Sequence, residues 1–470
     1  MTSTTAVVES PQRTRSVRWA LTSLSLSMLL SSLGTSIANV GLPTLALELN
    51  ASFAQVQWIV LAYLLAITTL IVSAGRLGDL TGRRRLLLIG IGLFTLASAL
   101  CGLAPNLGML IGARALQGLG AAIMMALTMA FVGETVPKEK TASAMGLLGT
   151  MSAIGTAMGP SFGGLLIAGF GWQAIFLINI PLGLLTLYLA HRYLPADHQK
   201  LKTAGFDPLG TLMLTLTLAA YALAMTLGRG HFGALNISLL LAAGLGIGLF
   251  VKVEERAPAP LIRTAMFRDV RLSCSLAMNL LVTTVMMATL VVGPFYLSQA
   301  LGLEAVSLGL VLSVGPLVAA LTSVPAGRLA DRFGTQRMTI AGLVALVFGC
   351  FTLSMLPETL GVGGYLAPMV VITLGYAVFQ TANNAAVMAD VQPDQRGLIA
   401  GMLGLSRNLG LITGASAMGA VFVLTSAAVD ISTAHPEAIA IGMRTTFRVA
   451  LGLIVVACCI AWGLQRKKPA

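Results

Sequence analysis

Long apolar stretches separated by short charged ones dominate the chain. A helix that crosses a bilayer needs about 20 consecutive apolar residues, and uncharged stretches of roughly that length recur fourteen times. They lie at 19–47, 49–75, 86–104, 115–133, 143–168, 174–190, 208–228, 230–251, 272–300, 305–326, 338–357, 364–389, 408–429 and 449–465. The pattern therefore predicts an all-α integral membrane protein with fourteen spans.

Composition supports a bilayer as the solvent. Charged residues make up 10% of the chain and apolar residues 56%, whereas a soluble domain has about 25% charged residues. So few charges would not cover a surface that faces water. The first apolar stretch is too long for a signal-peptide core and has no clear cleavage site after it, so we expect it to remain as a span.

The positive charges test the number of spans. An even number places both termini on one side of the membrane, and lysine and arginine gather in cytoplasmic loops. With the termini inside, only five of the 29 lysines and arginines fall outside the inner segments: Arg114, Arg229, Arg407, Arg444 and Arg448. This alternation predicts a multi-pass protein of the plasma (inner) membrane with both termini in the cytoplasm, and it explains the net charge of +12 without nucleic acid as a partner.

A charged motif occurs twice. GRLGDLTGRRR at residues 75–85 and GRLADRFGTQR at residues 327–337 share glycine, arginine, leucine and aspartate at matching positions. If the spans at 208–228 and 230–251 are set aside, each copy follows the second span of a six-span unit. The repeat predicts an N-terminal six-helix bundle (1–195), a linker with two inserted transmembrane helices (196–260) and a C-terminal six-helix bundle (261–470). Many transporters are built from two related halves around a central site.

Five stretches in the expected order resemble the major facilitator superfamily and, within it, the fourteen-span drug:proton antiporters. They are LGTSIANVGLP (33–43), GRLGDLTGRRR, ARALQGLGAA (113–122), GTMSAIGTAMGPSFGG (149–164) and WQAIFLINIPLG (172–183). The resemblance covers nearly the whole chain. It implies the major facilitator fold and a multidrug efflux transporter that exports small lipophilic compounds by alternating access, coupled to protons.

The repeated motif predicts a latch between the halves. Glycines let helix ends approach closely or turn sharply, and an aspartate can pair with arginines or face the positive end of a helix. Short inner loops also collect arginine for topological reasons, which explains Arg83–Arg85 but not the repeated spacing. The predicted latch residues are Gly75, Asp79, Gly82, Arg83, Asp331 and Arg332.

The GPxxGG run predicts a bent, closely packed helix. Pro160 removes a helix hydrogen bond and should bend the span, and small residues allow close helix contact. An ordinary tight contact explains this pattern equally well physically, and the resemblance alone links it to export. We expect the contact to lie between the halves and to act as a hinge formed by Gly155, Gly159, Pro160, Gly163 and Gly164.

Several polar residues inside spans are candidates for transport or coupling. An intramembrane arginine is costly and faces protein or water, and Arg114 shares a helix face with Gln117. The resemblance implies that Arg114 acts in substrate or proton coupling, whereas the alternative is a structural arginine bonded to carbonyls. Arg407 lies near a span end and could reach the interface. The amides that could line a cavity or join helices are Asn39, Asn179, Gln380 and Asn383, together with Asn279 and Asn384.

No acidic residue is predicted at mid-membrane. The first-span motif carries Gly34 where many family members have aspartate, and Glu254 is assigned to a loop. Without a buried carboxylate the site offers little compensation for a dication, so we predict neutral, anionic or weakly cationic amphiphiles as substrates. If transport is coupled to protons, Asp79, Glu134 and Asp390 near the inner gate are the remaining candidates for the proton carrier, and competition between protons and substrate without one dedicated carrier is the alternative.

Other functions have weaker support. The chain has no Ser/His/Asp set, metal-ligand spacing or Walker loop, so we expect no enzyme, metal or cofactor. A solute importer or facilitator for a sugar or organic acid on the same fold is one alternative, and a non-transporting membrane sensor is another. The sequence leaves open the substrate, the coupling ion, the oligomeric state and the role of the inserted helices.

Overall fold

The structure, a computed structural model, describes residues 11–51, 53–197, 207–227, 233–257, 260–262, 264–303, 305–357, 360–389, 391–426 and 435–466. All regular elements in these ranges are helical. The first part of the chain forms α1 (Pro11–Glu48), α2 (Phe53–Thr81), α3 (Arg83–Gly102), α4 (Leu107–Thr135), α5 (Thr141–Phe170), α6 (Ala174–Leu177) and α7 (Asn179–Tyr193).

The rest of the chain adds the inserted helices and the second bundle. The inserted helices are α8 (Pro208–Leu227) and α9 (Ala234–Arg256). The second bundle contains α10 (Val270–Phe295), α11 (Ala305–Phe333), α12 (Thr335–Ser354), α13 (Gly361–Ala389), α14 (Arg396–Thr425) and α15 (Pro436–Arg466). Short helical turns lie at η1 (Lys138–Lys140), η2 (Thr264–Arg268), η3 (Tyr296–Ala300) and η5 (Pro393–Gln395).

The fourteen predicted spans are present. Within the described ranges, thirteen helices are long and apolar enough to cross a membrane, and α5 supplies a fourteenth that bends by 42° between Gly159 and Phe162. Pro160 lies in this break, as the sequence predicts. The chain is therefore a multi-pass membrane protein.

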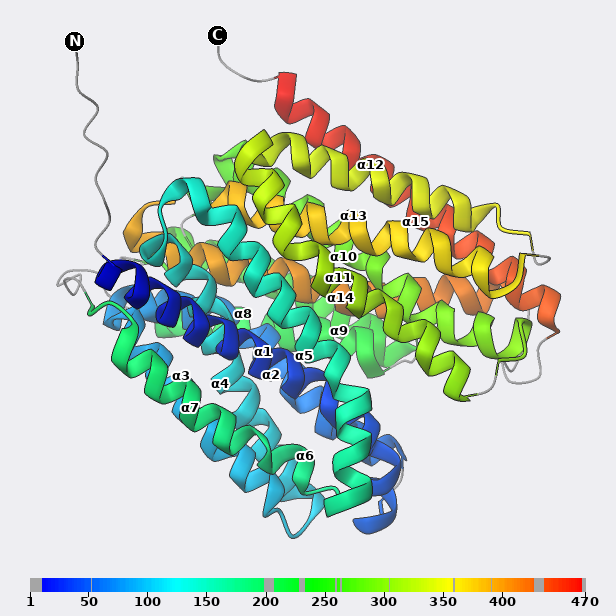
Figure 1. Ribbon diagram of the computed structural model, residues 1–470, viewed down its shortest axis with the longest axis horizontal. Helices are drawn as coiled ribbons and strands as arrows, with labels where there is room; N and C mark the ends of the chain where they lie inside the picture. Colours follow the sequence, from blue (N-terminus) through cyan, green and yellow to red (C-terminus); the bar gives the residue numbers. More distant parts are fainter. Residues whose placement is uncertain are drawn as a thin grey trace.

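The two bundles meet at one end of the molecule and diverge toward the other (Figure 1). The first bundle contains α1–α7 and the second contains α10–α15. The halves are joined mainly through α2 against α14 and α5 against α11. The inserted helices pack on each other, and α8 also contacts α2 and α14. The exact domain limits at residues 195 and 260 stay predictions.

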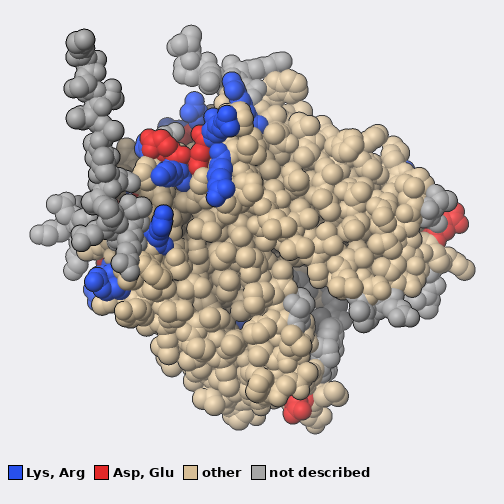
Figure 2. All heavy atoms as spheres, viewed as in Figure 1, with Lys and Arg blue, Asp and Glu red and all other residues tan. Residues whose placement is uncertain are grey.

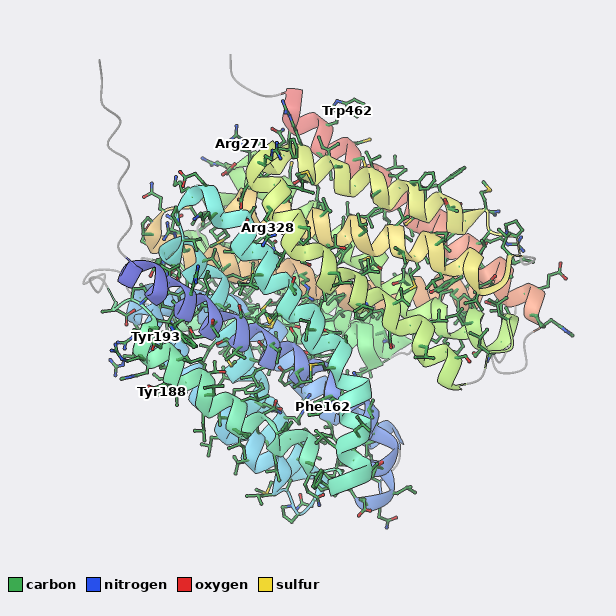
Figure 3. The ribbon with its side chains drawn as sticks, viewed as in Figure 1. Phe162, Tyr188, Tyr193, Arg271, Arg328 and Trp462 are labelled. Atoms are coloured by element: carbon green, nitrogen blue, oxygen red, sulfur yellow. The ribbon has the colours of Figure 1, made fainter. Side chains whose placement is uncertain are left out.

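Charged side chains gather at the end where the bundles meet (Figure 2). We call this the charged end, and the opposite one the far end. Arg271 and Arg328 lie near the charged end, whereas Tyr188 and Trp462 project from the outer surface (Figure 3). Trp19 stacks on Tyr193 with 5.7 Å between ring centroids. The remaining visible surface is largely uncharged, as expected for helices that face lipid.

The repeated motif differs from the prediction in one respect. Both copies were assigned to loops, but α2 continues to Thr81 and α11 to Phe333. Single glycines, Gly82 and Gly334, separate these helices from α3 and α12, with φ of 104° and 92°. Such positive φ angles favour glycine, so the predicted sharp turn is confirmed at these positions.

Candidate functional site

Asp79 joins the two halves at the charged end. Its Oδ1 accepts a hydrogen bond of 2.9 Å from the backbone N–H of Gly397, and its Oδ2 accepts one of 2.9 Å from Leu398. These N–H groups belong to the first turn of α14, which has no partners for them within its own helix. The carboxylate thus caps a helix of the opposite half and faces the positive end of its dipole.

Arg83 reinforces this contact from the start of α3. Its Nε and Nη2 donate to Oδ1 of Asp79 at 2.9 and 2.7 Å. The same guanidinium forms an ion pair with Glu134 of α4 and donates to the carbonyl oxygen of Pro393 in the second half. One side chain therefore links three helices of the first bundle to the segment before α14.

Asp331 repeats the arrangement in the opposite direction. It accepts hydrogen bonds from the backbone N–H groups of Ala142 at 3.0 Å and Ser143 at 2.9 Å, and from the Ser143 hydroxyl. These residues begin α5 in the first half. The predicted latch residues Asp79 and Asp331 therefore form two reciprocal helix caps between the bundles.

Glycines bring the capped helices into backbone contact. A β-carbon at Gly75 would overlap with the carbonyl oxygen of Gly397, and one at Gly327 would overlap with that of Ala142. Neither obstacle is a side chain that could rotate away. The first glycine of each motif copy thus permits the approach that its aspartate stabilises.

Arg332 does not take part as predicted. Its side chain is exposed, and its guanidinium lies 5.4 Å from the ring centroid of Phe333 on the same helix. The motif alignment explains the difference, because the position that matches Arg83 in the second copy is Thr335.

The sequence also missed Asp197, which was assigned to the linker. Its carboxylate accepts from the backbone N–H groups of Arg84 at 2.8 Å and Arg85 at 3.2 Å, so it caps α3. The available signal was an aspartate a few residues after a span that returns to the charged end.

Arg114 is fully buried and bonded to groups from three helices. Its Nε donates to the carbonyl oxygen of Ile59 at 2.9 Å and its Nη2 to that of Gly34 at 3.1 Å. Its Nη1 donates to the amide oxygen of Gln117, whose Nε2 donates to the Ser98 hydroxyl at 2.7 Å. The predicted common face of Arg114 and Gln117 is confirmed, while their role in transport stays a prediction.

Two aromatic rings complete the surroundings of Arg114. The guanidinium lies 4.2 Å from the ring centroid of Tyr63 and 5.8 Å from that of Phe176, distances at which a cation is attracted to a ring face. None of the ion pairs between described residues includes Arg114. Gly34 supplies a carbonyl oxygen where an aspartate would supply a charge, so the buried cation has neutral partners.

The predicted amides differ in their surroundings. Asn39 is exposed, whereas Asn179 is buried and leaves its Oδ1 without a partner. Asn383 is buried and donates to the carbonyl oxygen of Ser275 at 3.4 Å. Buried atoms without partners also occur at Gln380, Asn384 and Arg407. Gln380 and Asn384 are four residues apart on α13, so they lie on the same face of this helix.

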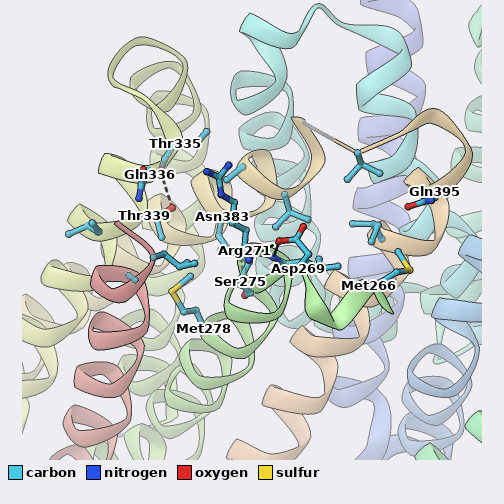
Figure 4. Close-up of a pocket in the computed structure, with 18 of the residues that line it drawn as sticks. Met266, Asp269, Arg271, Ser275, Met278, Thr335, Gln336, Thr339, Asn383 and Gln395 are labelled. Atoms are coloured by element: carbon cyan, nitrogen blue, oxygen red, sulfur yellow. Dashed lines mark hydrogen bonds between the residues drawn. The ribbon is translucent and has the colours of Figure 1, made fainter. Parts of the chain in front are cut away.

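Asn383 lines a cavity of about 580 Å³ at the charged end. Figure 4 shows Ser275 and Met278 of α10, Thr335 and Thr339 of α12 and Asn383 of α13 around it. Every lining residue belongs to the second half or to the segment just before it. This cavity therefore lies within the second half and not between the two halves.

The GPxxGG glycines do not lie between the halves, contrary to the prediction. Gly155 faces Leu29 and Ser32, and Gly159 faces Ser36, all on α1 of the same bundle. Gly163 also faces α1, and a β-carbon at Gly164 would meet only the Val40 side chain of α1, at 4.0 Å. The side chain of Pro160 lies outside the described residues. A glycine face shows that a helix packs closely, but it does not show on which neighbour.

Glycines earlier on α5 make the contact between halves instead. A β-carbon at Gly146 would overlap with the carbonyl oxygen of Ser323 on α11, and one at Gly149 would lie 3.3 Å from the Ser323 hydroxyl oxygen. The same helix thus uses one small-residue face toward α11 and another toward α1.

Comparisons with known proteins agree with this architecture. The riboflavin transporter RibZ of Clostridioides difficile (strain 630) is 28% identical over 94% of this chain and 96% of its own. The multidrug resistance protein Stp of Mycobacterium tuberculosis (strain ATCC 25618 / H37Rv) is 32% identical over 87% of this chain and 76% of its own.

A solved structure shows the same fold. The structure of the proton:xylose symporter XylE bound to 6-bromo-6-deoxy-D-glucose matches with a TM-score of 0.69 over 96% of each chain, at 14% identity. The Major Facilitator Superfamily matches residues 24–415. The chain therefore belongs to the major facilitator superfamily of membrane transporters, which are not enzymes.

Proposed function

We propose that this protein is a secondary-active exporter of small lipophilic compounds that works by alternating access. The observation that carries the proposal is the pair of reciprocal caps made by Asp79 and Asp331. They close the charged end through a few hydrogen bonds to helix starts. Such bonds can be exchanged for water when the halves rotate, so the same groups can hold one state and release the other.

The charge balance around Arg114 supports a substrate class. A buried cation with neutral partners disfavours a second positive charge nearby. We therefore expect neutral, anionic or weakly cationic amphiphiles in the space between the halves. The similarity to a multidrug resistance protein supports a broad range of such compounds.

Riboflavin is a second candidate substrate. The riboflavin transporter RibZ aligns with nearly the full length of both chains, and riboflavin has a planar ring system and no positive charge at neutral pH. It therefore fits the same charge balance.

The charge distribution supports an orientation in the membrane. The charged end carries the lysines and arginines that favour the cytoplasmic side, so we place it and both termini in the cytoplasm and the protein in the plasma membrane. In this orientation the far end faces outward.

Two of the residues that the sequence predicts for proton coupling lie at the charged end. Asp79 and Glu134 both contact Arg83, so protonation of either would weaken that link. The third sequence candidate, Asp390, lies outside the described residues.

Dye efflux from cells or vesicles tests the proposal. We expect faster export by the native protein when a proton gradient is present, and slower export by Arg114→Ala and Asp79→Asn. Glu139→Gln is a matched control, because Glu139 is an exposed acid at the same end. Gradient-independent movement would indicate a facilitator, and inward accumulation would indicate an importer. Unchanged levels of dyes and riboflavin on expression would contradict the export proposal.

A further inference from the structure

The two inserted helices bring a pair of carboxylates together at the charged end. Asp207 precedes α8, and its Oδ1 accepts from the backbone N–H of Gly210 at 2.8 Å. Glu254 lies in the last turn of α9, where its Oε2 accepts from the backbone N–H of Ile262 at 3.3 Å. The sequence assigned Glu254 to a loop, but it is helical and only 3% exposed.

Each carboxylate keeps one buried oxygen without a hydrogen-bond partner. These atoms are Oδ2 of Asp207 and Oε1 of Glu254, and they are the only carboxylate oxygens of this kind among the residues described. Both lie against the same point beside Gly210, where a β-carbon would be 2.6 Å from Oδ2 and still closer to Oε1. The two oxygens that lack partners therefore lie close to each other, on the same side of Gly210.

Few charges act on this pair. Arg76 of α2 acts on Glu254 from the neighbouring helix, but no ion pair joins either acid to a cation in the described part of the chain. The other charged residues of α9 (Lys252, Glu255 and Arg256) and Arg268 of η2 are exposed. α8 carries no charged residue.

We propose that Asp207 and Glu254 form a site that holds one proton between them. Two carboxylates that share a site do not both ionise readily, because their charges repel. A buried oxygen without a partner is also costly. A proton on one of the two carboxylates removes the repulsion between the charges. The protonated acid can also donate a hydrogen bond to the oxygen of the other carboxylate, which then has a partner.

The position of the site assigns a role to the insert. Besides α9, α8 contacts α2 and α14, which are the helices joined by Asp79, and the Tyr221 hydroxyl of α8 bonds to the Thr413 hydroxyl of α14. Loss of the proton places two negative charges between the ends of α8 and α9. The hairpin that touches both halves therefore responds to proton binding, whatever the substrate or direction of transport.

Infrared difference spectroscopy of the purified full-length protein tests the proposal with the proton as the ligand. The spectra compare neutral with strongly alkaline pH and follow the carbonyl band of protonated carboxylic acids. We expect a band that disappears at alkaline pH in the native protein and in the control Glu255→Gln. The band should already be lost at neutral pH in Asp207→Asn, Asp207→Ser and Glu254→Gln.

Each other outcome overturns the proposal. A band that is absent from the native protein means that both acids are ionised or hold another cation. A band that persists in both Asp207 variants but not in Glu254→Gln assigns the proton to Glu254 alone. Asparagine and serine at position 207 keep an acceptor for the Gly210 N–H, so we expect both variants to fold, which size-exclusion chromatography checks. The measurement needs no transport, so its failure is separate from failure of the proposed function.

Discussion

Asp79 and Asp331 hold equivalent positions on α2 and α11, and each caps the first turn of a helix in the opposite bundle. Asp79 accepts from Gly397 and Leu398 of α14, and Asp331 accepts from Ala142 and Ser143 of α5. The two copies of the repeated motif therefore make the same type of contact, a helix cap on the opposite bundle. Two independent points secure the charged end, so a movement that separates the halves must break both.

Amide exchange should report each cap separately. Asp79→Asn leaves one acceptor oxygen in place of two charged ones, which should cost about 1–3 kcal/mol. We expect faster hydrogen–deuterium exchange at Gly397 and Leu398 but little change at Ala142 and Ser143. Asp331→Asn should give the reverse pattern, so each variant is the control for the other. Equal acceleration at both sites in either variant would show that the caps are not independent.

Alanine at the close glycines should push the halves apart at the charged end. Gly75→Ala and Gly327→Ala each place a methyl group on a backbone carbonyl of the other half, and overpacking of this kind costs about 1–3 kcal/mol. We expect faster amide exchange at the starts of α14 and α5, respectively, and slower efflux. Gly92→Ala is the matched control, because a β-carbon there meets nothing within 4 Å. Normal efflux by both variants would argue against a tightly closed charged end.

Much of the architecture could be predicted from the sequence. The thickness of the bilayer sets the length of each span, and lysines and arginines indicate which loops lie on the cytoplasmic side of the membrane. The repeated Gly and Asp positions likewise predicted the latch. The helix ends were less predictable. The predicted spans end at the first charged residue, whereas α2 and α9 continue as helices past Arg76 and Lys252. That is why Glu254 was placed in a loop.

The sequence also did not show which helices or side chains contact each other in the fold. The glycines of α5 showed close packing, but only the structure shows that Gly155 and Gly159 face α1 and that Gly146 faces α11. Arg332 follows Asp331 directly, but neighbouring residues on a helix point in different directions, and the side chain of Arg332 is exposed. The carboxylate pair was equally hidden, because 47 positions separate Asp207 from Glu254.

We expect lysine to be a poor structural substitute for the buried Arg114. The guanidinium of Arg114 bonds to Ile59, Gly34 and Gln117 in three directions, a geometry that a lysine ammonium does not reproduce. We expect Arg114→Lys to lose about 1–3 kcal/mol of stability and to lower the midpoint of thermal unfolding in detergent. Arg328→Lys is the control, because Arg328 is exposed. An unchanged midpoint in Arg114→Lys would contradict a structural contribution of these bonds.

The neutral surroundings of Arg114 should limit the charge of exported dyes. We expect the native protein to export a monovalent dye at least about tenfold faster than a divalent viologen, a factor that corresponds to about 1.4 kcal/mol. Gly34→Asp should narrow this gap, because it adds a carboxylate beside Arg114 and Tyr63. Side-by-side efflux assays in vesicles measure both rates.

Gly34→Asn separates charge from shape in this test. Asparagine matches aspartate in size and meets the same Tyr63 hydroxyl, where a β-carbon would lie 2.9 Å from the oxygen, but it adds no charge. If charge compensation decides the selectivity, Gly34→Asn leaves the dication slow while Gly34→Asp speeds it up. Equal rates for both variants would attribute the change to displacement of Tyr63. Rapid export of the dication by the native protein would contradict the proposal that the neutral partners of Arg114 disfavour dications, because none of its described partners is a carboxylate.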